Sequence, residues 1–295
     1  MKGKHFLTVK DFSKEELLGL ISDALKIKNL QKQGKEHEYL KNKNLAMVFQ
    51  KPSTRTRMSF EVGINQLGGK AIYITQAEIG LGERESIADV SRVLSRYVDG
   101  VMIRPFYHSD VKEFAKHSSV PVINGLCDLY HPCQVMADML TIYEKKGTFD
   151  GLKLCYIGDG NNVCQSLSNI CEIFGIEMTV SCPKGYELSD HENQHAKTIY
   201  DPNEAAKDSD VIYTDVWTSM GPNKEESDHK DFLDYTITMD ILSNAKKDVT
   251  FMHCLPAHRG EEVTNEVLES SYSVVFDQAE NRMHAQKAIL VALMG

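Results

Sequence analysis

Residues 45–57 read LAMVFQKPSTRTR, and this stretch decides the fold. The apolar run 45–49 predicts a buried β-strand, and the polar residues after it predict a loop that leads directly into a helix at 56–67. Gly68 and Gly69 end that helix, because glycine readily adopts the left-handed conformation of a helix C-cap. A strand followed at once by a helix indicates a βα unit of a parallel sheet.

The same alternation continues along the chain. The strands expected around the first unit lie at 71–74, 100–103 and 120–123, and the helices at 14–30, 86–97 and 110–117. An amphipathic helix at 131–145 leads to a second series, with strands at 154–158, 177–182, 211–214, 250–254 and 274–276 and a last helix at 279–293. We predict an α/β protein with two doubly wound parallel-sheet domains joined by helices, the C-terminal helix returning to the first domain. The expected domains are 1–134 with 279–295, and 135–278 with the connecting helix.

Composition narrows the class of protein. A chain of 295 residues is expected to hold two hydrophobic cores, and no apolar run approaches the ~18 residues of a membrane span. The net charge of -9 excludes a general nucleic-acid surface, so any anion site must be local. The seven cysteines form no CxxC pair, and the N-terminus shows no export signal, so we expect a reducing, cytoplasmic location.

The loop after the first strand is a candidate anion site. Ser53, Thr54, Arg55, Thr56 and Arg57 place hydroxyls, guanidinium charge and the N–H groups of a helix start together, which suits a phosphate dianion. A capped helix start with two solvated arginines is the alternative for such a run. The position at the carboxyl edge of a parallel sheet favours the anion site. The loop lacks the glycines and lysine of a P-loop, which argues against a nucleotide triphosphate.

Four segments together resemble one family. The run Ser53 to Arg57 is similar to the STRTR signature of the aspartate and ornithine carbamoyltransferase family, and Arg104 ends the third strand as it does there. Residues 131–134, HPCQ, match the HPxQ element of the family, and Arg282 lies in an AENR segment that is also similar. The resemblance extends over essentially the whole chain.

The resemblance implies carbamoyl transfer from carbamoyl phosphate to an amine. It implies that the first domain binds carbamoyl phosphate and that the carbonyl oxygen is polarised by Thr56, Arg104 and His131, while Gln134 holds the carbamoyl nitrogen. The implied carbamoyl-phosphate ligands are Ser53, Thr54, Arg55, Thr56, Arg104, His131, Gln134, Cys254, Leu255 and Arg282. The implied catalytic residues are Arg55, Thr56, Arg104, His131 and Cys254.

The second domain decides the acceptor. Residues 253–256, HCLP, resemble the element of ornithine carbamoyltransferases, whereas aspartate enzymes carry an arginine where this chain has Ala257. The resemblance implies that Cys254 and Asp215 orient the amine, that Leu255 adds a backbone carbonyl, and that Cys254 is not a covalent nucleophile. It also implies four ornithine ligands: Asn162, Asp215, Ser219 and Met220. Without the resemblance, a tight turn or a surface loop would explain these segments equally well.

No metal or cofactor is expected, because the phosphate leaves easily and no metal-ligand spacing is visible. The resemblance implies a homotrimer with active sites near subunit interfaces. The chain departs from the family at Gly80, where a glutamine or histidine is common, and a backbone N–H would have to replace that contact. The rival acceptor is putrescine, and the rivals of other classes are a non-catalytic amino-acid or phosphate sensor and a phosphosugar or nucleotide enzyme.

Overall fold

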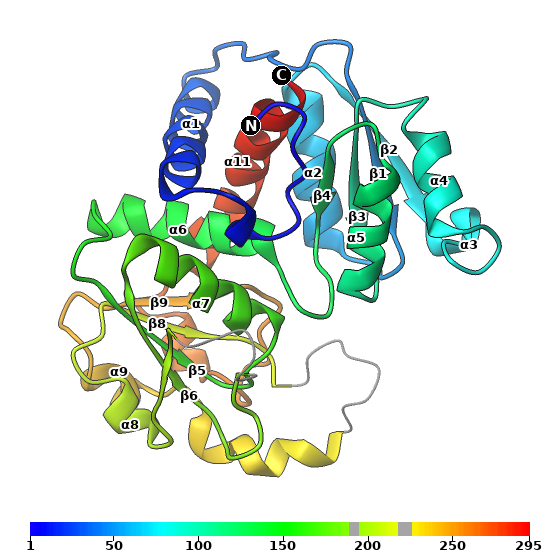
Figure 1. Ribbon diagram of the computed structural model, residues 1–295. Helices are drawn as coiled ribbons and strands as arrows, with labels where there is room; N and C mark the ends of the chain where they lie inside the picture. The colour runs from blue at the N-terminus through cyan, green and yellow to red at the C-terminus, as the bar shows by residue number, and fades with distance from the viewer. Residues whose placement is uncertain (189–194, 218–225) are drawn as a thin grey trace. The chain divides into compact units, whose positions relative to one another are not determined.

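The computed structural model describes residues 1–188, 195–217 and 226–295, which form two compact units (Figure 1). One unit contains Met1–Leu140 and Glu280–Gly295, and the other contains Thr141–Ala279. The C-terminal helix therefore returns to the first unit, as predicted. The junction near residue 140 lies within α6 (Pro132–Lys146), as does the expected boundary after residue 134, which stays a prediction.

The first unit is built on a four-stranded parallel sheet. Its strand order is β2 (Lys70–Thr75), β1 (Asn44–Phe49), β3 (Gly100–Arg104) and β4 (Val122–Asn124). The central strands β1 and β3 are almost entirely buried, because helices cover both faces of a parallel sheet. The edge strand β2 alternates between exposed and half-buried positions at its start.

The helices of this unit begin where capping residues stand. Ser13 caps α1 (Lys14–Lys32) in a capping box with Glu16, and Ser53 caps α2 (Thr54–Gln66). The others are the short helix η1 (Val9–Asp11), α3 (Gln76–Ile79), α4 (Ile87–Leu94), α5 (His108–His117) and α11 (Val275–Met294). Among the described residues no helix combines the length and the apolar character that crossing a membrane requires.

The second unit contains a five-stranded parallel sheet. The strand order is β7 (Lys197–Thr198), β6 (Glu177–Ser181), β5 (Lys153–Ile157), β8 (Val211–Thr214) and β9 (Thr250–His253). The helices are α7 (Asn162–Phe174), α8 (Pro202–Ala205), η2 (Glu226–Tyr235), α9 (Met239–Ser243) and α10 (Asn265–Leu268). Two parallel sheets with helices between their strands confirm the predicted fold class.

Parallel pairing aligns the strand ends that carry polar residues. In the first unit Phe49 pairs with Arg104, so the loop before α2 and the end of β3 lie side by side. In the second unit Thr214 pairs with His253, so Asp215 and Cys254 leave neighbouring strands at the same edge. Both edges are carboxyl edges, where open α/β sheets bind ligands.

One predicted strand is wrong. Residues 274–276 do not form a strand, because α11 already begins at Val275. Only a single parallel bridge joins Phe251 to Ser273 before the helix starts. A short apolar run such as SVVF does not by its periodicity separate a buried strand from the first turn of a buried helix. The strand expected at 120–123 is β4, which starts two positions later.

Amines are buried between α1 and α11, which lie side by side in Figure 1. Lys28 is 5% exposed, and its Nζ donates to Asn281 Oδ1 at 2.7 Å. Lys287 is fully buried, and its Nζ donates to Gln31 Oε1 at 2.6 Å and lies 3.1 Å from His37 Nε2. Burial lowers the pKa of Lys287 to about 8, since the interior disfavours its charged form.

His284 belongs to the same buried layer. Its Nε2 lies 3.3 Å from Glu280 Oε1. Burial, followed by the charge of Lys287, lowers the pKa of His284 to about 4, although Glu280 acts in the opposite direction. Between pH 6.5 and pH 4 the unfolded chain therefore binds a proton that the native chain does not, and stability falls as pH falls through this window.

We expect His284→Gln to reduce this acid sensitivity. The substitution keeps a polar side chain of similar length but removes the titration. The loss of unfolding free energy between pH 7 and pH 4.5 should be smaller than in the unaltered chain, by about 1 kcal/mol or more. Urea unfolding at the two pH values measures this. The same loss in both proteins would contradict the assignment.

Candidate active site

The loop after β1 presents the start of α2. Ser53 Oγ accepts the backbone N–H of Thr56 at 3.3 Å and donates to Thr56 Oγ1 at 3.1 Å. Thr56 is buried, Ser53 is half-buried, and Thr54 and Arg55 are exposed. The other backbone N–H groups of the first turn have no partner within the helix, so they are suited to an anion.

Two buried guanidinium groups converge on Thr56. Arg104 Nη1 donates to Thr56 Oγ1 at 3.3 Å, and Arg282 Nη2 donates to the same oxygen at 3.4 Å. Arg282 Nη1 also donates to Gln134 Oε1 at 2.5 Å, and Gln134 Nε2 donates to Asp138 Oδ1 at 2.8 Å. Residues from four distant parts of the sequence thus form one hydrogen-bonded group: Thr56, Arg104, Gln134 and Arg282. Their role as carbamoyl-phosphate ligands stays a prediction.

The group is strongly cationic. Burial, then the charges of Arg282 and Arg55, lowers the pKa of Arg104 to about 10. Burial, then Arg282, Arg104 and Arg55, holds the pKa of His131 well below its usual value. His131 is therefore a neutral imidazole at neutral pH, and the arginines keep their charges. A dianion placed here would relieve the repulsion between these guanidinium groups.

Arg57 faces away from this group. Its Nε donates to Glu61 at 3.0 Å, and its guanidinium lies 4.0 Å from the centre of the Tyr73 ring. It lines a cavity of about 480 Å³ together with residues that include Ser53, Thr54 and Met58. This open cavity adjoins the anion loop on the side of the edge strand β2.

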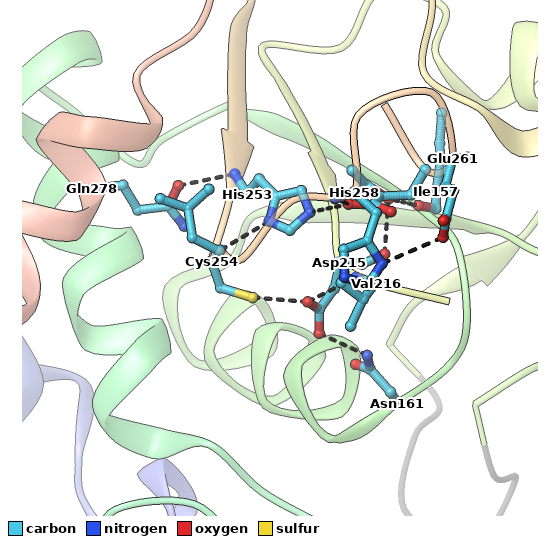
Figure 2. Close-up of polar contacts among 12 residues, drawn as sticks. Ile157, Asn161, Asp215, Val216, His253, Cys254, His258, Glu261 and Gln278 are labelled. Carbon is cyan, nitrogen blue, oxygen red and sulfur yellow. Dashed lines mark hydrogen bonds and ion pairs between the residues drawn. The ribbon is translucent and has the colours of Figure 1, made fainter. Parts of the chain in front are cut away.

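In the second unit three polar residues form a chain at the carboxyl edge of the sheet (Figure 2). Asn161 Nδ2 donates to Asp215 Oδ2 at 2.8 Å, and the Cys254 thiol donates to Asp215 Oδ1 at 3.0 Å. Oδ1 also accepts the backbone N–H of Val216 at 2.8 Å. Asp215 is only 7% exposed, so its carboxylate is held by these donors in a fixed orientation.

The loop after β9 is held by a buried histidine. Leu255 adopts the left-handed conformation (φ 60°), and its N–H donates to His253 Nδ1 at 2.8 Å. His253 Nε2 lies 2.9 Å from Glu262 Oε1, and the backbone N–H of His253 donates to Gln278 Oε1 at 2.9 Å. These contacts fix the peptide that connects Cys254 to Leu255.

The remaining predicted residues are placed as follows. Asn162 is the half-buried first residue of α7, next to the capping Asn161. Ser219 and Met220 lie outside the described residues. Gly80 is the left-handed C-cap of α3, where a Cβ would stand 2.7 Å from Arg84 Cβ. Its N–H donates to Gln76 O at 2.8 Å, so in this conformation it is not available to replace the missing family contact.

The sequence predicted neither the two contacts of Asn161 nor the contact of Glu262 with His253. Asn161 Oδ1 caps α7 by accepting the N–H groups of Val163 and Cys164, and an Asn directly before a helix is the signal that would have found it. Glu262 lies nine residues after His253 in a loop, and no local pattern indicates that the two side chains meet.

Among the residues that the structure describes, two clusters contain ligand types for a metal ion. One is Asp215, His253 and Cys254, and the other is His258, Glu261 and Glu262. Both ring nitrogens of His253 already face hydrogen-bond partners, so the first cluster would have to give up the loop geometry to bind a metal through that ring. The contacts around Asp215 and Cys254 are hydrogen bonds within the chain.

Comparison with known proteins identifies the family. Residues 4–144 match the model of the carbamoyl-P binding domain of aspartate/ornithine carbamoyltransferase. Residues 150–293 match the Asp/Orn binding domain of the same family. The chain belongs to the aspartate/ornithine carbamoyltransferase family.

Within this family its relatives include ornithine carbamoyltransferases. The chain is 50% identical to that of Pyrococcus horikoshii, covering 100% of this chain and 97% of the relative. It is 52% identical to the ornithine carbamoyltransferase of Archaeoglobus fulgidus, and the match covers 99% of this chain and 98% of the relative. The solved structure of the Pyrococcus furiosus ornithine carbamoyltransferase aligns with a TM-score of 0.95 at 49% identity. The alignment covers 100% of this chain and 98% of that structure's chain.

The double role of Asn161 generates a stability prediction. Asn161→Ala removes both the cap of α7 and the donor to Asp215, whereas Asn161→Ser keeps a cap oxygen. We expect the Ala variant to be less stable than the Ser variant by about 1 kcal/mol, the usual value of an N-cap. Urea unfolding curves of both variants provide the measurement. Equal stabilities would show that the cap contributes nothing.

Proposed function

We propose that this chain transfers the carbamoyl group of carbamoyl phosphate to the side-chain amine of L-ornithine, giving L-citrulline and phosphate. The amine nitrogen forms a bond to the carbonyl carbon, the bond from that carbon to the phosphate oxygen breaks, and the amine loses a proton. The observation that carries the proposal is the convergence of buried Arg104 and Arg282 on Thr56 at a helix start. The identity to ornithine carbamoyltransferases over the whole chain supports the acceptor.

The first unit supplies the site for carbamoyl phosphate. The first-turn N–H groups of α2, the hydroxyls of Ser53 and Thr54, and Arg55 bind the phosphate in this proposal. The exposed position of Thr54 and Arg55 leaves both able to turn toward a ligand. Arg104 and Arg282 neutralise the remaining charge. Their burial strengthens these interactions, because water does not screen them.

The same group stabilises the transition state. As the amine attacks, negative charge develops on the carbonyl oxygen, and donors fixed in advance lower the barrier. Thr56, Arg104 and neutral His131 are the donors in this proposal. The low pKa of His131 leaves it uncharged, so that it donates a hydrogen bond without competing with the arginines for the phosphate. Gln134, held by Arg282 and Asp138, accepts from the carbamoyl nitrogen.

The second unit supplies the site for ornithine. Asp215 and Asn162 bind the α-amino and α-carboxylate groups, with Ser219 and Met220 completing this part of the site. Cys254 and the carbonyl of Leu255 orient the side-chain amine and contact the carbamoyl group. Because the Cys254 thiol donates to Asp215, it acts as a neutral hydrogen-bonding group and not as a thiolate nucleophile. Aspartate would need a cation for its second carboxylate, and Ala257 provides none.

The decisive experiment compares acceptors. Purified chain with carbamoyl phosphate should form citrulline from ornithine and little carbamoylputrescine from putrescine, measured side by side. A preference for putrescine would leave the phosphate site standing but would remove the roles of Asp215, Asn162, Ser219 and Met220. Absence of turnover with either amine would identify a binding protein without catalysis.

A matched pair of variants belongs to the same experiment. Asp215→Asn should lower kcat/KM for ornithine by about 10²-fold, since misplacing a reacting group by about 1 Å has this effect. Asp234→Asn removes the same charge from an exposed position on η2 and serves as the control. An equal effect in both variants would point to net charge instead of orientation.

We further propose a cytoplasmic homotrimer with active sites near the subunit interfaces. Support comes from an apolar side chain beside the anion loop. Met58 is 52% exposed and lines the cavity that adjoins Ser53 and Thr54. Exposed apolar groups around a cavity favour contact with another chain.

Light scattering of the purified chain tests the trimer. Met58→Lys places a charge in the apolar surface and should shift the mass from trimer toward monomer, with a parallel loss of activity. Leu233→Lys introduces the same charge at a side chain that is 65% exposed in the second unit and should leave the mass unchanged. A monomeric unaltered chain would contradict the proposal.

A further inference from the structure

A second cluster of charged side chains lies in the loop between β9 and α10. Glu261 N donates to His258 O at 2.9 Å, and Gly260 N donates to Val263 O at 2.9 Å, so residues 258–263 form a closed turn. His258 Nδ1 lies 3.3 Å from Glu261 Oε2, the contact drawn as a dashed line in Figure 2. One ring nitrogen of His258 and one carboxylate oxygen each of Glu261 and Glu262 lie within 4.8 Å of one another.

Glu262 is the unusual member of this cluster. Its side chain is completely buried, and its Oε1 accepts from the backbone N–H of His258 at 2.7 Å and faces His253 Nε2 at 2.9 Å. His253 Nδ1 accepts the N–H of Leu255, so this ring faces Glu262 through Nε2 alone. Both of these contacts of the buried Glu262 carboxylate fall on its Oε1.

The second oxygen of Glu262 makes no such contact. Oε2 is buried, and it has no hydrogen-bond partner within the described parts of the chain. An ionised carboxylate in such a position is costly unless a cation or several donors meet it. The nearby His258 and Glu261 offer a further nitrogen and oxygen in place of a compensating positive charge. A bound cation would satisfy all three residues.

We propose that His258, Glu261 and Glu262 form a binding site for a divalent transition-metal ion, with Zn²⁺ as the preferred ion. One imidazole and two carboxylates are ligand types that Zn²⁺ takes in tetrahedral sites, and water would fill the fourth position. Neither a thiolate nor an all-oxygen set is present, which disfavours Cu⁺ on one side and Ca²⁺ or Mg²⁺ on the other. Of the other two ligands, His258 is exposed and Glu261 is half-buried, so the ion has access from solvent.

The site reaches the acceptor loop through Glu262. The same carboxylate that would bind the ion through Oε2 holds His253 through Oε1, and His253 in turn holds the N–H of Leu255. Occupancy would therefore stiffen the segment that carries Cys254 and Leu255 without contact between the ion and either residue. This inference concerns binding only and holds whichever amine the chain accepts.

Isothermal titration of the full-length, tag-free chain with ZnCl₂ tests the site, after chelator treatment. Glu261→Gln and His258→Ala remove one ligand each at positions that are not fully buried, so the fold should survive. Each should weaken Zn²⁺ binding by at least about tenfold. Even the loss of a group that only hydrogen-bonds to a metal ligand lowers the affinity for the metal by about that factor. Glu269→Gln is the control. It removes a charge on the neighbouring Arg259–Glu269 ion pair and should bind as the unaltered chain does.

Two further readouts exclude the cluster at Cys254. Cys254→Ala should retain the Zn²⁺ affinity that Glu261→Gln loses, and the Co²⁺-loaded chain should lack the absorption of a cobalt–thiolate bond. Zn²⁺ should also raise the thermal unfolding midpoint of the unaltered chain and of Glu269→Gln, but not that of Glu261→Gln. Binding lost in Cys254→Ala and kept in Glu261→Gln would overturn the proposal, as would the absence of binding.

Discussion

The first unit holds two buried guanidinium groups close together, although their positive charges repel each other. Two guanidinium groups, from the end of a central strand and from the C-terminal helix, donate to the same threonine hydroxyl. Burial and the neighbouring arginines lower the pKa of Arg104 to about 10 and that of His131 well below its usual value, so this environment disfavours further positive charge. The strand register, the Ser53 cap and the return of α11 all serve to hold these charges in place.

The second unit shows the opposite electrostatic character at the equivalent edge of its sheet. Asp215 accepts hydrogen bonds from an amide, a thiol and a backbone N–H, which fix the orientation of its carboxyl group. An acidic group of fixed orientation suits a diamino acid, just as the arginine group of the first unit suits a phosphate. Parallel strand pairing produces both arrangements, because residues that follow neighbouring strands must meet at one edge.

Much of this could be predicted from the sequence. The buried strands were visible as apolar runs, and the residues after them were visible as polar loops. The failures have physical reasons. Residues 274–276 are too few for their periodicity to separate strand from helix. The contact of His253 with Glu262 depends on how a loop folds back, and the use of the Gly80 N–H depends on a helix end. Neither leaves a local pattern.

The discontinuity of the first unit has a consequence for synthesis of the chain. The hydrogen bonds from Lys28 to Asn281 and from Lys287 to Gln31 join α1 to α11, so they form only when residues 280–294 are present. At about 5–20 residues per second, the ribosome needs roughly 7 to 28 seconds to pass from residue 140 to residue 280. During that interval the nascent first unit exposes the apolar face that α11 covers. The last segment to emerge thus completes the part of the protein that began to fold first.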